Sequence, residues 1–328
     1  MTLPKGKLGL TDLEQFVFPH LPRVDDRRSV LLDYGITRMD GNVVVASDPV
    51  LGIPLRFYGF FAVHYSSTDV AMAWATPQYL SLGIYYPPNT QEDWLIATMK
   101  QLGHEAQQLK LTVIGGHTGG YDGLQIPLIS TTCFGVLPEA PLSAPEAKPG
   151  DVIIAVGPIA RETLWFLANV EPSTVDAIFP RSQREELAND LAPFSMVPLV
   201  KTLPRNRIAL LHDLAEGGLA TGLFELQQAT KLGITIQYNE IPWDEPGIKL
   251  FNYLEWDPLH CSSFGSFLIV TETAVANDII QTLNGFNRKA AIIGTFTKKK
   301  HIRIEYDEKS KHLTPGEDPY KRFTTHIT

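Results

Sequence analysis

Hydrophobic positions along the chain follow two periodicities, one typical of strands and one of helices. Short β-branched or aromatic runs predict buried strands; they lie at residues 43–47, 80–85, 111–113, 126–133, 152–156 and 208–211. A spacing of three and four residues from Leu95 to Leu109 predicts a long helix that starts at Thr90. Strands and helices alternate in both halves, so the pattern predicts an α/β or α+β fold with two layers.

A segment rich in proline and alanine divides this pattern. It runs from Leu137 to Lys148 and closes on Lys148-Pro149-Gly150-Asp151. Such punctuation is typical of a boundary between domains. We therefore predict one domain at residues 1–147 and a second at 148–328.

Composition limits the classes of function. A chain of 328 residues with 44% hydrophobic content can bury a large core. Its net charge of −8 argues against a nucleic-acid surface, which needs a basic stripe. The basic run Lys298-Lys299-Lys300-His301 is expected to form a solvated hairpin tip between two strands.

The same composition gives an expectation about the compartment. Cys133 and Cys261 lack the spacing of metal ligands and suit a reducing cytosol. No apolar run approaches the roughly 18 residues of a membrane helix, and the N-terminus lacks the apolar region of a signal peptide. We expect a cytoplasmic protein with no membrane segment.

The stretch Ile114–Gly123 has five glycines in ten positions. Glycine lets the backbone approach a ligand closely, and successive amides in such a loop can hold anionic oxygens. His117 and Asp122 add an imidazole and a carboxylate. The stretch matches neither a P-loop nor a dinucleotide-binding fingerprint. The alternative is a glycine-rich hairpin with a polar tip.

Two carboxylates also lie where they could serve a site. Asp48 follows the predicted strand 43–47 and precedes Pro49, so it could bind a ligand or simply form a turn. Asp69 follows the cluster Ser66–Thr68, which we expect to cap a helix with Asp69 in its first turn. A negative charge is favoured there by the helix dipole, so this position needs no ligand to explain it.

A second motif follows the strand predicted at 208–211. It reads His212-Asp213-Leu214-Ala215-Glu216-Gly217-Gly218 and leads into a helix predicted at 219–232. The amides of Gly217 and Gly218 could face an anionic ligand at the start of that helix. The alternative is close packing of helix against strand, which also favours glycine.

These stretches together resemble the aminoimidazole-ribonucleotide-synthetase (AIR synthase, PurM-like) superfamily, which includes thiamine-monophosphate kinase and HypE. The matching segments come in the family's order: residues 43–49, Asp69-Val70-Ala71 with Pro77, Gly115-Gly116-His117-Thr118, 148–151 and 212–220. The resemblance implies a PurM-like fold whose N-terminal domain pairs its sheet across a homodimer. It also implies a C-terminal α/β domain and a cleft in which ATP is held through Mg²⁺. Members of the family transfer a phosphoryl group from that ATP.

The resemblance also assigns candidate roles to single residues. Asp48 and Asp69 would bind the metal, and an earlier acidic segment of the family corresponds here only to Asp33 or Asp40. The candidate cofactor-binding residues are Gly115, Gly116, Thr118, Gly119, Gly120, Asp213, Gly217 and Gly218. His117, at a position where the family's kinases carry Asp, is the candidate catalytic residue.

The sequence leaves the reaction partly open. No cysteine follows Cys261, so we expect none of the carbamoyl transfer that HypE performs on a terminal cysteine. The favoured function is ATP- and Mg²⁺-dependent phosphoryl transfer to an unknown small-molecule or protein acceptor. The alternative is a nucleotide-binding or assembly protein that has lost catalysis. A metal-binding scaffold built on His117 and Asp122 is a third hypothesis.

Overall fold

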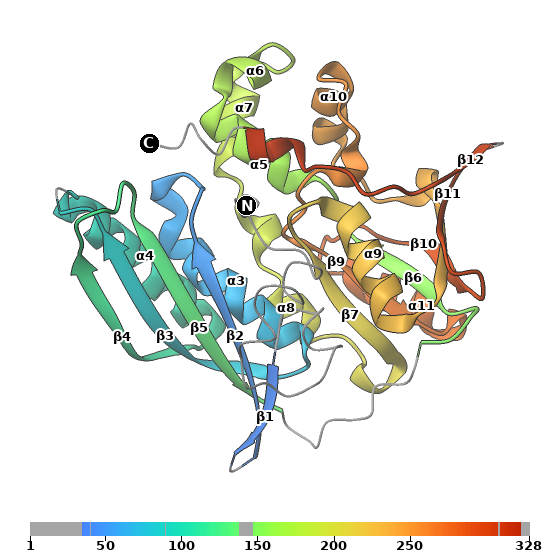
Figure 1. Cartoon of the computed structure of the whole chain (residues 1–328), viewed down its shortest axis with the longest axis horizontal. Helices are drawn as coiled ribbons and strands as arrows, with labels where there is room; N and C mark the ends of the chain where they lie inside the picture. Colours follow the sequence, from blue (N-terminus) through green and yellow to red (C-terminus); the bar gives the residue numbers. More distant parts are fainter. Residues whose placement is uncertain (1–34, 40, 89, 138–146, 308, 323–328) are drawn as a thin grey trace.

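The computed structural model describes residues 35–39, 41–88, 90–137, 147–307 and 309–322, and places them in two β-sheets with helices packed on both (Figure 1). The fold is a mixed α/β arrangement, as the alternating pattern predicts. None of the described helices combines the length and apolar character that a membrane span requires.

The first sheet has five strands in the order β1-β2-β5-β3-β4. In chain order these strands are β1 Gly35–Met39, β2 Gly41–Val50, β3 Thr76–Tyr86, β4 Thr112–Gly120 and β5 Leu128–Val136. Strands β3 and β4 are parallel, and the other neighbours are antiparallel. Helix α3 (Tyr58–Met72) packs on β2 and β5, and helix α4 (Glu92–Leu109) packs on α3.

The second sheet has seven strands in the order β12-β11-β8-β10-β6-β9-β7. They are β6 Val152–Val156, β7 Ile208–Leu214, β8 Gly233–Gln237, β9 Ser266–Thr271, β10 Ala290–Thr297, β11 Ile302–Tyr306 and β12 Lys309–His312. The helices are α5 Arg161–Val170, α6 Pro172–Asp176, α7 Arg181–Asn189, α8 Val197–Val200, α9 Gly218–Thr230, α10 Glu245–Tyr253 and α11 Thr273–Asn284. Short 3-10 turns include η2 Leu55–Phe57, η6 Pro258–His260 and η7 Pro319–Arg322.

Several elements coincide with the sequence predictions. The long helix is α4, the run 152–156 is β6, and the run 80–85 lies within β3. The helix predicted at 219–232 is α9, and Lys298–His301 lies between β10 and β11. The boundary proposed at 147/148 falls in the segment between the two sheets and stays a prediction.

The helix around Asp69 differs from its prediction. The Ser/Thr cluster does not cap a helix start, because α3 already begins at Tyr58 and ends at Met72. Ser66, Ser67 and Thr68 lie inside it and are fully buried. Ser67 donates a hydrogen bond back to the His64 carbonyl at 3.5 Å. Tertiary burial on two sheets outweighs the preference of Ser and Thr for helix ends.

The glycine-rich stretch also differs from its prediction. Residues up to Gly120 form the edge strand β4 rather than a loop, exposed along almost its whole length. Gly116 is required by close approach, since a Cβ there would lie 2.1 Å from the Leu82 carbonyl oxygen. A similar extension holds for β2, which continues through Asp48 and Pro49 to Val50. Pro49 pairs with Ser130 of β5, and the described residues of β1 pair with β2 only as far as Val45.

Aromatic side chains join the two sheets into one continuous core. The Phe61 ring of α3 lies 5.2 Å from Trp165 of α5 and 5.5 Å from Phe194. Tyr65, also in α3, meets Phe264 edge-on at 4.7 Å. Such ring pairs add about 0.5–1.5 kcal/mol each beyond area burial. Helix α3 is therefore fixed between the two sheets.

Candidate functional site

Helix α3 places Asp69 at the junction of the two sheets. The helix packs on β2 and β5 of the first sheet, and also on β7 of the second sheet and on α8. Asp69 is only 7% exposed and lies in the last turn. The helix dipole disfavours a carboxylate there by several tenths of a kcal/mol, on the order of 0.3–1. A role in capping the start of this helix is thus removed.

Polar atoms without partners occur in the same region. Within the described part of the chain, Ser66 Oγ, Thr68 Oγ1, Thr131 Oγ1 and His64 Nδ1 are buried and make no hydrogen bond. The other ring nitrogen of His64 lies 3.0 Å from Glu105 of α4. A buried polar atom without a partner costs about 1–3 kcal/mol. These buried groups of α3 and β5 therefore have unused hydrogen-bonding capacity.

Asp48 lies on the α3-facing side of the first sheet. It is opposite Thr131 of β5 and lies on the same face of β2 as the buried residues Ala46 and Val50. The Cys133 thiol on β5 senses its charge. Burial raises the pKa of Cys133 to about 12, and the negative charge of Asp48 contributes. Asp48 and Asp69 thus belong to two elements in direct contact.

The glycine strand lies elsewhere. Strands β5 and β3 separate β2 from β4, which corresponds to about 14 Å at the usual strand spacing. Figure 1 shows β4 at the edge of the first sheet that faces away from the second sheet. Its residues Gly115, Gly116, Thr118, Gly119 and Gly120 are therefore not beside Asp48 in the same subunit.

His117 has an aromatic environment on that edge. Its Nε2 forms a hydrogen bond with the hydroxyl of Tyr121. Its ring stacks on Tyr85 of β3, with 6.0 Å between centroids. The imidazole is exposed, so it is available to a ligand that approaches the edge.

The diglycine motif is used by the fold itself. Gly218 needs to be glycine, because a Cβ would lie 2.1 Å from the Cys261 carbonyl oxygen. The Gly217 amide donates a 2.8 Å hydrogen bond to Asp318 Oδ2, at the start of α9. Asp318 is 3% exposed and comes from the segment after β12. The chain's own carboxylate thus takes the position that the sequence suggests for an anionic ligand. Asp213 lies on β7, the strand on which α3 packs.

Sequence reasoning missed Glu162, which lies beside this motif. Its Oε2 accepts hydrogen bonds from Ser262 Oγ at 2.6 Å and from the Phe264 amide at 2.8 Å. Burial, together with the charges of Asp318 and Glu216, raises the pKa of Glu162 to about 7, although the hydrogen bonds from Ser262 and Phe264 oppose this shift. Nothing in the local sequence marks this residue, since its partners lie about a hundred positions away in the chain.

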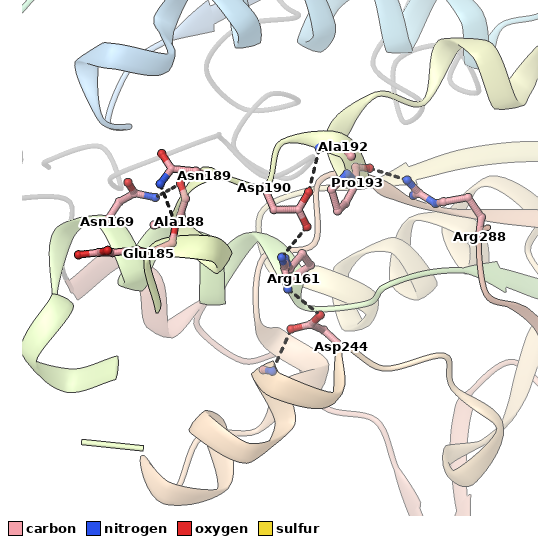
Figure 2. Close-up of polar contacts among 11 residues, drawn as sticks. Arg161, Asn169, Glu185, Ala188, Asn189, Asp190, Ala192, Pro193, Asp244 and Arg288 are labelled. Carbon is pink, nitrogen blue, oxygen red and sulfur yellow. Dashed lines mark hydrogen bonds and ion pairs between the residues drawn. The ribbon is translucent and has the colours of Figure 1, made fainter. Parts of the chain in front are cut away.

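The buried arginine nearby is committed to structure. Figure 2 shows Arg161 of α5 between two carboxylates, at 2.7 Å from Asp190 and 3.3 Å from Asp244. Asp244 also caps α10 by accepting from the Gly247 amide. Burial raises the pKa of Asp244, and the Arg161 guanidinium opposes that shift. Arg161 thereby links α5, α7 and α10.

The candidate metal ligands fit Mg²⁺ in chemistry. Carboxylate and hydroxyl oxygens are the donors that this ion prefers, and it keeps several waters, so few protein ligands suffice. The described ranges contain no cluster of three or more His, Cys, Asp or Glu side chains that could hold a metal. Asp33 and Asp40 lie outside the described residues. The predicted ligand set consists of Asp48, Asp69 and either Asp33 or Asp40, and it stays a prediction.

Comparison with known proteins agrees with this architecture. The model of the AIR synthase related protein N-terminal domain matches residues 33–137, and that of the C-terminal domain matches 148–307. The chain belongs to the AIR synthase related protein family. Carbamoyl dehydratase HypE of Azotobacter vinelandii is 29% identical over 279 residues, covering 81% of this chain and 79% of that protein.

Two solved structures of known proteins have the same fold. The hydrogenase maturation protein HypE in complex with ATP matches with a TM-score of 0.70 and 22% identity, covering 90% of this chain and 92% of that chain. Thiamine monophosphate kinase of Aquifex aeolicus, complexed with AMPPCP and TMP, matches with a TM-score of 0.68 and 14% identity. That match covers 87% of this chain and 92% of that one.

Proposed function

We propose that this protein binds Mg²⁺–ATP and transfers a phosphoryl group to an acceptor that the sequence leaves unidentified. The observation that carries the proposal is the carboxylate of Asp69, buried in the last turn of α3, which packs on the strand β2 that carries Asp48. The nucleotide in the HypE complex and the analogue in the thiamine monophosphate kinase complex support it.

The residues have distinct tasks in this proposal. Asp48 and Asp69, with Asp33 or Asp40, hold Mg²⁺, which supplies neutralisation of phosphate charge. The amides of the 115–120 strand approach the phosphates, and Asp213 contacts the bound nucleotide from the second domain. His117, whose ring bonds to Tyr121, takes a proton from the acceptor in this proposal.

The homodimer is part of the same proposal. A triphosphate chain does not bridge the roughly 14 Å between β2 and β4. Two subunits that join through their first sheets place the glycine strand of one beside the acidic residues of the other. Exposed apolar side chains on this sheet, including Ile114 at 59% and Tyr79 at 43%, support a contact there.

The alternative function, nucleotide binding or assembly without catalysis, also has an observation in its favour. The Gly217 amide is occupied by Asp318, so the second domain does not offer that amide to a phosphate in this conformation. Hydrolysis of ATP and release of phosphate by the purified protein would exclude this alternative.

Calorimetric titration with Mg²⁺–ATP tests the metal ligands. Asp48→Asn and Asp69→Asn should each weaken binding at least tenfold, about 1.4 kcal/mol, because an amide replaces a charged oxygen ligand. Both variants should remain folded, since removing one of two neighbouring carboxylates relieves repulsion. Asp278→Asn, on the exposed face of α11, removes the same charge elsewhere and should bind as the wild type does. Unchanged affinity in both site variants would refute the assignment.

A further inference from the structure

A basic surface forms at the outer edge of the second sheet. It consists of the turn Lys298–His301 and the β11–β12 hairpin, and we call it the basic ribbon. Six of its fifteen residues between positions 298 and 312 are Lys or Arg and three are Asp or Glu, whereas the whole chain carries −8. The strand register places Arg303 opposite His312, and the His301 and His312 rings lie 4.7 Å apart. Pairing of β12 with β11 therefore gathers charges that are separate in the sequence.

Much of this charge has no partner within the described residues. Lys311 Nζ lies 3.9 Å from Asp257, and Arg303 Nε lies 3.8 Å from Glu305. No described carboxylate comes within 4.0 Å of Lys309 or of the three lysines of the turn. All four of these lysines are exposed. The ribbon is therefore a positive surface on an acidic protein.

The ribbon also offers free backbone groups. Strand β12 is the last in the order of its sheet, so none of the described strands pairs with its outer edge. The Leu313 amide donates to the Ile302 carbonyl at 3.0 Å. Because hydrogen-bonded pairs alternate along an antiparallel ladder, Lys309 and Lys311 point their backbone groups toward β11. The amides and carbonyls of Ser310 and His312 point outward.

We propose that the basic ribbon binds an extended acidic segment of a partner protein, which adds as a strand along β12. The backbone of the segment pairs with Ser310 and His312. Its acidic side chains, at alternate positions, meet Lys309 and Lys311, and the turn lysines receive further charges. This mode combines main-chain hydrogen bonds with side-chain specificity.

Protection against aggregation and binding of nucleic acid fit the ribbon less well. Lysine on an edge strand discourages aggregation, but that role does not require three consecutive lysines in the neighbouring turn. A nucleic acid would match the charge but has no amide backbone to pair with Ser310 and His312. Binding of single-stranded nucleic acid also uses exposed aromatic rings for stacking, and Tyr306 of this segment packs 4.6 Å from Tyr238, while the His301 and His312 rings pack on each other. An acidic partner is attracted by the positive ribbon and repelled by the negatively charged remainder of the molecule, which favours the ribbon over other surfaces.

Fluorescence anisotropy tests the proposal with a labelled octapeptide of alternating Glu and Thr. The wild type should bind this peptide and not the matching Lys/Thr peptide, and binding should weaken as salt rises from about 0.05 to about 0.5 M. The double variant Lys309→Glu/Lys311→Glu should lose at least tenfold in affinity. The turn variant Lys298→Glu/Lys299→Glu/Lys300→Glu, which leaves β12 intact, should also bind more weakly.

A proline substitution separates strand addition from simple charge attraction. Ser310→Pro removes an outward amide and keeps every charge, and it should also lose at least tenfold. Ser310→Thr keeps the amide and should bind as the wild type does. The proposal fails if no peptide binds, if Ser310→Pro binds normally, or if a uridine oligonucleotide binds more tightly than the acidic peptide. Circular dichroism confirms that each variant is folded.

Discussion

At the residue scale, the sequence singled out two candidate carboxylates but could not describe their surroundings. Asp48 and Asp69 stood out because one ends a β-branched run and the other follows a Ser/Thr cluster. The contact between their two elements, β2 and α3, could not be inferred from the sequence, since it depends on how β2, β5 and α3 stack. Glu162 carried no local signal at all. Its raised pKa results from burial and from residues about a hundred positions away.

The titration of Glu162 predicts a pH-dependent stability. Its pKa is raised from 4.5 to about 7, so the folded state binds the proton more tightly than the unfolded chain does. This contribution is present in full below pH 4.5 and is lost as the pH rises through 7. Glu162→Gln keeps an oxygen that accepts from Ser262 and cannot ionise.

Denaturation at several pH values measures the effect. The free energy of unfolding of Glu162→Gln minus that of the wild type should increase by about 1–3 kcal/mol between pH 5 and pH 8. Glu186→Gln, on the exposed surface of α7, is the matched control and should show no such trend. A difference that stays constant with pH would contradict a buried, proton-binding Glu162.

The two thiols should be chemically inert in the folded protein. Cys133 and Cys261 are buried, and burial raises the pKa of both thiols, so little thiolate forms. Mass spectrometry after iodoacetamide treatment at pH 8 should find neither cysteine modified in the native state and both modified in denaturant. Native labelling of either residue, or a carbamoyl or thiocyanate adduct on it, would be inconsistent with this burial.

At the element scale, sequence patterns succeeded where periodicity and packing agree. Helix α4 has one apolar face and was predicted within two residues of its start. Helix α3 was misjudged because almost all of its side chains are buried, so it shows no polar face, and its Ser/Thr cluster resembles a cap. Strand β4 was misjudged because glycine usually disfavours strands. Here the close approach to Leu82 requires glycine within the strand.

Helix α4 ends in a conformation that favours glycine. Its C-cap, Lys110, has φ 59° and ψ 39°, in the left-handed region, and is exposed. Lys110→Gly should therefore raise the free energy of unfolding by about 0.5–1 kcal/mol. Lys100→Gly, in the interior of the same helix and also exposed, should lower it by about 1 kcal/mol. Urea denaturation measures the free energy of unfolding of both variants. A change of the same sign in both would contradict the left-handed conformation of Lys110.

At the scale of the whole molecule, the order of motifs revealed the family, while the arrangement of motifs in space required the structure. Five short motifs in one order are specific even though each alone is weak. Their order does not show that β5 and β3 separate β4 from β2 in the sheet. Nor does it show that Phe264 of the second domain packs on Phe61 and Tyr65 of α3. Those relations depend on contacts between residues that are distant in the chain.

The open edge and exposed apolar residues of the first sheet predict a homodimer. Light scattering at micromolar concentration should give twice the mass of the 36.4 kDa chain. Ile114→Glu, on β4 and 59% exposed, should shift the protein toward the monomer, because a charge is costly in an apolar contact. Ile96→Glu, on α4 and 48% exposed, is the control and should leave the mass unchanged. A monomeric wild type would count against the dimer.

The bond between Gly217 and Asp318 has a consequence for how the protein is made. Helix α9 leaves the ribosome well before Asp318, which accepts a hydrogen bond at the start of this helix, because Asp318 is translated 101 residues after Gly217. Until then the first turn of α9 has only water for that amide. The strands β8 to β12 are also synthesised in this interval. The second domain therefore gains this buried hydrogen bond late in translation, so a nascent chain that stalls before Asp318 leaves the start of α9 without its carboxylate partner.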